Sequence, residues 1–83
     1  MSEWARRAHH YLNVTGRLRG FRNLSEGQRY EVIREGILEF MRDNPIGEDE
    51  AEEALEWFLA RRKIHEARVF AKVMGLRIGR RRV

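Results

Sequence analysis

Residues 47–83 read GEDEAEEALEWFLARRKIHEARVFAKVMGLRIGRRRV, and they pass from an acidic start through a helical apolar pattern to a basic end. Asp43 to Glu56 contain seven carboxylates and no cation, whereas Trp57 to Val83 contain nine Lys and Arg residues against one glutamate. The formal net charge of +4 therefore hides an acidic lobe and a separate basic lobe. A basic lobe of this kind indicates a polyanionic partner, with nucleic acid as the first candidate.

Two apolar stripes can be drawn through the helical part of this segment. The members of the first stripe are Ala51, Ala54, Leu55, Phe58 and Leu59. The positions where its next apolar residues should fall are instead occupied by Arg62, His65 and Glu66. The second stripe alternates without a break at spacings of three and four, as in a coiled-coil seam. Its members are Trp57, Ala60, Ile64, Ala67, Ala71 and Met74.

The two stripes lead to alternative structures. Because no Gly or Pro marks a break, we favour one continuous helix from about Glu48 to Met74. The alternative is two helices that meet near Arg61 to Lys63. A single helix of this length in so small a chain would need a partner along the second stripe, so the continuous helix implies a homodimer through those residues. The carboxylates at Glu48, Asp49 and Glu50 suit the positive end of the helix dipole.

The N-terminal half predicts two further helices. Ser2 can cap a first helix that ends near Asn13 to Gly16. Ser25 and Gln28 form a capping box for a second helix, which should stop near Asp43 because Asn44 precedes Pro45. Gly36 lies inside this second helix and suggests that another backbone packs closely there.

Length and composition favour a single domain. The 83 residues contain no cysteine and no apolar run long enough to cross a bilayer, so we expect a soluble cytoplasmic protein without a membrane partner. The predicted fold is all-α, a small bundle of three to four helices with a long C-terminal helix or a helical hairpin. Residues 1–83 form the domain and residues 76–83 a basic tail. The expected core comprises Trp4, Tyr11, Leu12, Tyr30, Ile33, Ile37, Phe40, Leu55, Phe58, Leu59 and Phe70.

The arginines carry the functional hypothesis. The chain has fifteen Arg and two Lys, and guanidinium suits bidentate contact with phosphate. Cations beside a phosphate backbone release counterions, which gives affinity that falls steeply with salt. The predicted contacts are Arg68, Lys72, Arg77, Arg80, Arg81 and Arg82, with a second contact from Arg17, Arg19 and Arg22 in the loop GRLRGFRN. The sequence does not distinguish DNA from RNA.

Residues 69–83, VFAKVMGLRIGRRRV, resemble the first helix and turn of a helix-turn-helix, with Ala71 at the packing position, Gly75 at the turn and Leu76 after it. A recognition helix needs about two more turns, and only five residues follow Ile78. We therefore interpret the arginines as phosphate binders that do not read bases.

Other chemistries find little support in the sequence. His9 and His10 are adjacent and point about 100° apart on a helix, and His65 stands alone, so we expect no metal site and no cofactor. The carboxylates between Glu48 and Glu56 lack a nucleophile or a phosphate loop, so we expect no enzyme. Aromatic residues at helical spacing could stack on unpaired bases but more often form core: Trp4, Trp57, Phe58 and Phe70.

The rival hypothesis is a protein-interaction module, a small regulator or inhibitor that docks on a larger protein through its separated charges.

Overall fold

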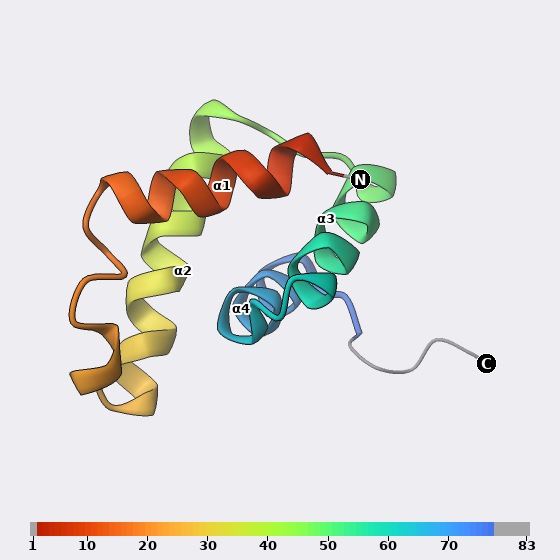
Figure 1. Ribbon diagram of the computed structural model, residues 1–83. Helices are drawn as coiled ribbons and strands as arrows, with labels where there is room; N and C mark the ends of the chain where they lie inside the picture. The colour runs from red at the N-terminus through yellow and green to blue at the C-terminus, as the bar shows by residue number, and fades with distance from the viewer. Residues whose placement is uncertain (1, 78–83) are drawn as a thin grey trace.

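The computed structural model describes residues 2–77, and within this range the chain is helical with no strand. The chain order of its elements is shown in Figure 1. They are α1 (Glu3–Val14), the 3₁₀ turn η1 (Phe21–Asn23), α2 (Glu26–Asp43), α3 (Glu48–Ala60) and α4 (Ile64–Met74). Residues 78–83 of the predicted basic tail, which include Arg80, Arg81 and Arg82, lie outside the described residues. None of the described helices is long and apolar enough to cross a bilayer.

The helix starts follow the capping signals of the sequence. The Ser2 side chain accepts a hydrogen bond from the Ala5 amide at 3.1 Å and begins α1. At the start of α2 the capping box forms in both directions: the Gln28 amide donates to the Ser25 hydroxyl, and the Ser25 amide donates to the Gln28 side chain. The predicted end of α2 near Asp43 is confirmed.

The prediction of one continuous helix from Glu48 to Met74 is wrong, because α3 and α4 are separate helices. Arg62 adopts a left-handed conformation with φ 61° and ends α3. The amides of Arg62 and Lys63 turn back to the carbonyls of Leu59 and Phe58, at 3.0 Å and 2.8 Å. This pair of bonds closes a helix end and normally uses glycine. The chain therefore breaks without the glycine that would have marked the break in the sequence.

The predicted coiled-coil seam does not exist as one surface. It would have to continue across the turn at Arg61 to Lys63, where the helix stops. Two of its members, Ala67 and Ala71, are buried in the core of the same chain. The structure therefore removes the geometric basis on which the homodimer was predicted.

The four helices of residues 2–77 enclose one core. In Figure 1, α1 crosses over the upper part of α2 and points its N-terminus towards the start of α3, while α4 lies between α2 and α3. The indole N–H of Trp4 donates to the Asn44 carbonyl at 2.7 Å and ties α1 to the α2–α3 connection. The Trp4 ring also packs against Phe40 of α2 and Phe70 of α4.

Most of the predicted core is buried, but the small residues were missed. Tyr11, Tyr30 and Leu59 are only partly buried, whereas the other predicted core residues are buried. Small side chains let the helices approach closely, and the buried ones absent from the prediction are Ala5, Ala8, Ala51, Ala54, Ala67 and Ala71. At Gly36 the close neighbours are side chains: an added Cβ would clash with Leu12 Cδ2 and lie 2.8 Å from Arg17 Cδ.

Candidate nucleic-acid interface

A hollow of about 820 Å³ lies between the loop that leads into α2 and the start of α4. We call it the larger hollow. Basic side chains from two separate parts of the chain meet in it, Arg22 from η1 and Arg62 with Lys63 from the α3–α4 turn. Its other lining residues are His9, Leu18, Gly20, Phe21, Asn23, Ile33, Ile64, His65 and Glu66.

The loop side of the larger hollow is fixed in place by Arg29 of α2. The Arg29 side chain donates from Nε to the Phe21 carbonyl at 3.2 Å and from Nη2 to the Arg22 carbonyl at 3.0 Å. Its guanidinium also lies over the Phe21 ring, 5.5 Å from the centroid. The Arg29 side chain thus holds the backbone of η1. The side chain of Arg22 is exposed and lines the hollow.

A second hollow of about 300 Å³ adjoins the larger one through His65, which lines both. His65, Arg68 and Lys72 are spaced by three and four residues and so share one face of α4. Glu26 and Tyr30 of α2 lie on the opposite side of this smaller hollow. Basic residues from η1, the α3–α4 turn and α4 line the two hollows, and we call them the basic strip: Arg22, Arg62, Lys63, His65, Arg68 and Lys72.

The Glu26 carboxylate neutralises Arg68 of the basic strip only weakly. Arg68 Nη1 lies 3.9 Å from Glu26 Oε2, and both side chains are largely exposed, at 62% and 82%. Exposed pairs at this distance contribute little and are screened by salt. Arg68 is therefore available to an external anion.

The structure assigns different places to the predicted contact residues. Arg22, Arg68 and Lys72 belong to the basic strip. Arg19 and Arg77 are exposed but line neither hollow. The predicted contacts Arg80, Arg81 and Arg82 lie outside the described residues.

Arg17 is engaged inside the protein. Its Nη2 donates to Glu39 Oε1 at 2.8 Å, and its guanidinium lies over the Tyr11 ring at 5.8 Å from the centroid. The Tyr11 hydroxyl donates to the same carboxylate oxygen at 2.8 Å. This hydrogen bond lowers the pKa of Glu39 and raises the pKa of Tyr11, so the carboxylate stays ionised beside Arg17. Arg17 therefore joins α1 and α2 and is not part of the basic strip.

Three members of the basic strip were missed by the sequence analysis: Arg62, Lys63 and His65. The preferred continuous helix placed them in mid-helix, pointing in different directions. The signal that could have found them was the first apolar stripe, which ends on Arg62 and His65 because the helix itself ends there.

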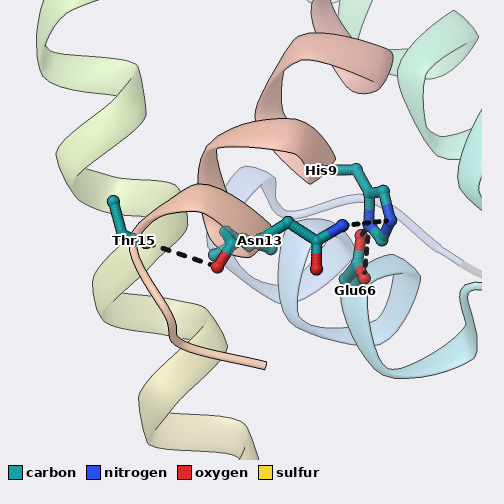
Figure 2. A network of polar contacts seen from close by, with 5 residues as sticks. His9, Asn13, Thr15 and Glu66 are labelled. Carbon is teal, nitrogen blue, oxygen red and sulfur yellow. Dashed lines mark hydrogen bonds and ion pairs between the residues drawn. The ribbon is translucent and has the colours of Figure 1, made fainter. Parts of the chain in front are cut away.

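The inner side of the larger hollow contains a polar pair, the partly buried His9 ring and the buried Glu66 carboxylate, that connects α1 to α4. Figure 2 shows the His9 ring and the Glu66 carboxylate directed at one another. Nδ1 of His9 lies 2.8 Å from Oε1 and 2.9 Å from Oε2 of Glu66, which is only 5% exposed. Burial raises the pKa of Glu66, and the nearby His9 partly opposes this shift. Among residues 2–77, no group of three or more His, Cys, Asp and Glu side chains is placed to hold a metal ion.

The acidic lobe occupies a different element from the basic strip. The carboxylates of α3 are exposed: Glu48, Asp49, Glu50, Glu52, Glu53 and Glu56. The acidic segment of the sequence thus lies on the outward side of α3, whereas the basic strip lies at the two hollows beside α4.

Comparison with known proteins finds no matching family model, no similar curated protein and no similar solved structure.

Proposed function

We propose that this protein binds nucleic acid without catalysing a reaction, by contacting the phosphate backbone through the basic strip. The observation that supports this function is the meeting of cations from η1, the α3–α4 turn and α4 around two adjoining hollows. Arg77 and the arginines at positions 80–82 follow α4 in the chain and would extend the contact.

The expected affinity is electrostatic. Arg22, Arg62, Lys63, Arg68 and Lys72 are permanent cations, and each phosphate that they neutralise releases condensed counterions. If all five contact a single strand, the affinity should fall by about 100-fold between about 50 mM and about 200 mM salt. The exposed carboxylates of α3 would repel the same strand and keep it on the side of the basic strip.

The test is a binding titration by fluorescence anisotropy, with a labelled single strand and a labelled duplex of random sequence at these two salt concentrations. The double variant Arg68→Ala/Lys72→Ala removes two cations of the basic strip. It should weaken binding about tenfold or more at low salt and flatten the dependence on salt. A chain that ends at Arg77 tests the contribution of the terminal arginines and keeps Leu76, which packs on the core.

The matched control is Arg42→Ala. Arg42 is exposed in the last turn of α2, at the opposite end of that helix from Glu26 and the smaller hollow. Its loss changes the net charge by one but should leave binding nearly unchanged. Equal losses for Arg42→Ala and for single changes at Arg68 or Lys72 would show that binding depends on overall charge and not on the basic strip. Absence of binding at low salt, with co-purification of a discrete protein, would instead favour the protein-interaction module.

A further inference from the structure

We propose that the larger hollow accepts one unstacked base of a single strand while the basic strip holds the neighbouring phosphates. This inference rests on the proposed function and adds to it the class of nucleic acid: single strands or unpaired segments in preference to duplex.

The lining of the larger hollow suits a base better than a bare phosphate chain. Leu18, Phe21, Ile33 and Ile64 supply apolar surface. The rings of Phe21 and His65 meet edge to face, with centroids 5.2 Å apart, and form one aromatic side of the hollow. Aromatic side chains beside a basic groove are the usual means by which proteins bind single strands without reading sequence.

The charges of the hollow set the orientation of the nucleotide. Arg22 and Arg62 are exposed at its edge, whereas the Glu66 carboxylate is buried at its inner side. An anionic phosphate is attracted to the edge and repelled by the carboxylate. The neutral base therefore enters, and the phosphates on either side of it remain with the cations.

The backbone at Arg62 supports a role for its side chain. Among the described residues, Arg62 is the only one other than glycine with a positive φ. A left-handed conformation is unfavourable for a residue with a Cβ, and glycine would relieve it. An arginine at this position places a guanidinium on the hollow that glycine could not supply.

Base pairing decides which nucleic acids can use the hollow. In a duplex each base is stacked and paired, so entry would require the pair to be broken. A single strand has no such requirement. Binding to duplex should therefore use the basic strip alone.

The experiment compares three fluorescent probes at about 50 mM salt, each of about 12 nucleotides: an oligothymidine strand, an abasic strand with the same number of phosphates, and a duplex. The wild-type protein should bind oligothymidine about fivefold or more tightly than the abasic strand. Phe21→Ala should bring this ratio close to one, and it should weaken duplex binding no more than it weakens binding to the abasic strand. Lys72→Ala should weaken binding to all three probes alike.

A second variant, Ile64→Ser, guards against a loss of folding in Phe21→Ala. Ile64 lines the hollow and is 47% exposed, so its replacement removes apolar surface without opening the core. It too should reduce the preference for oligothymidine, and circular dichroism should show unchanged helix content. Equal affinity of the wild type for oligothymidine and the abasic strand would overturn this inference and leave backbone binding intact. Failure of all three probes to bind would overturn the proposed function itself.

Discussion

The ends of α1, α3 and α4 have the same backbone geometry but do not share the same residue. At each end one amide bonds the carbonyl three residues back, and the next amide bonds the carbonyl five residues back. The residue in the left-handed conformation is Gly16 after α1 and Gly75 after α4, with φ 78° and 73°. After α3 it is Arg62, with φ 61°.

The difference shows what a local sequence signal can and cannot report. Glycine marks a helix end because it adopts the left-handed conformation without a steric cost. At Arg62 the same turn forms against the preference of the residue, so the surrounding packing must hold it. Val69, Phe70 and the buried alanines of α4 gain their place in the core only when the chain turns at this point.

The largest expected effect concerns the end of α1, which rests on α2 at Gly36. Gly36→Ala would place a methyl group against Leu12 and Arg17, the two residues joined by the second hydrogen bond of that helix end. Overpacking of this kind should lower the free energy of unfolding by about 1–3 kcal/mol. The measurement is urea denaturation followed by circular dichroism.

Gly27→Ala is the matched control in the same helix. An added Cβ at Gly27 meets nothing within 4 Å, so alanine should stabilise α2 by about 0.5 kcal/mol. If Gly36→Ala proves as stable as Gly27→Ala, the close contact between α1 and α2 is not as the structure shows it.

A reciprocal exchange at the ends of α3 and α4 tests the comparison directly. Arg62→Gly relieves the strained turn and should raise the free energy of unfolding by about 0.5–1 kcal/mol. Gly75→Arg introduces the same strain where nothing lies within 4 Å, and it should lower the free energy of unfolding by about 1 kcal/mol. The measurement is again urea denaturation.

A binding measurement on Arg62→Gly separates the effect of this residue's backbone on stability from the contribution of its side chain to binding. Arg62→Gly should weaken binding to a single strand although it makes the protein more stable, because it removes a cation of the basic strip. A variant that is stabilised and binds as tightly as the wild type would mean that the Arg62 side chain has no part in binding.

The smallest effect is a dependence on pH that originates at Glu66, in the first turn of α4. Burial raises its pKa above the ordinary 4.5, against the weaker influence of His9, Lys63 and His65. Between pH 4.5 and the raised pKa, the Glu66 carboxyl keeps its proton in the folded protein but has lost it in the unfolded chain. The contribution of Glu66 to stability is therefore greatest below about pH 4.5, and it declines as pH rises through the raised pKa.

Glu66→Gln removes this titration. The difference between the unfolding free energies of the wild type and Glu66→Gln, measured by urea denaturation from about pH 4 to about pH 8, should change across that window in the stated direction. Curves that run parallel over the whole range would contradict a raised pKa at Glu66.

The sequence predicted those parts of the fold that depend on neighbouring residues. Ser2, the Ser25–Gln28 pair and Gly75 act within one helical turn, and the structure confirms the helix ends they indicated. The alanines of the core carry no such signal, because a small residue becomes core only when another helix covers it.

The candidate site was harder to predict because it depends on contacts across the chain. Arg17 and Arg22 occur in one loop with similar neighbours, yet Arg17 bonds Glu39, 22 residues away, and Arg22 lines the larger hollow. Nothing within one turn of either residue distinguishes them. His65 and Arg62 join the basic strip only because α3 stops where the sequence shows no break.

Aromatic rings link the four helices of the described part of the chain in an unbroken series. Neighbouring ring centroids are 5.2–5.7 Å apart along Tyr11, Phe40, Trp4, Phe70, Phe58 and Trp57. No helix can leave the bundle without separating two of these rings, so partial opening is costly and the helices should unfold together. The two tryptophans belong to different helices of the series, α1 and α3, so their intrinsic fluorescence and the near-ultraviolet dichroism of the rings would report one and the same cooperative transition.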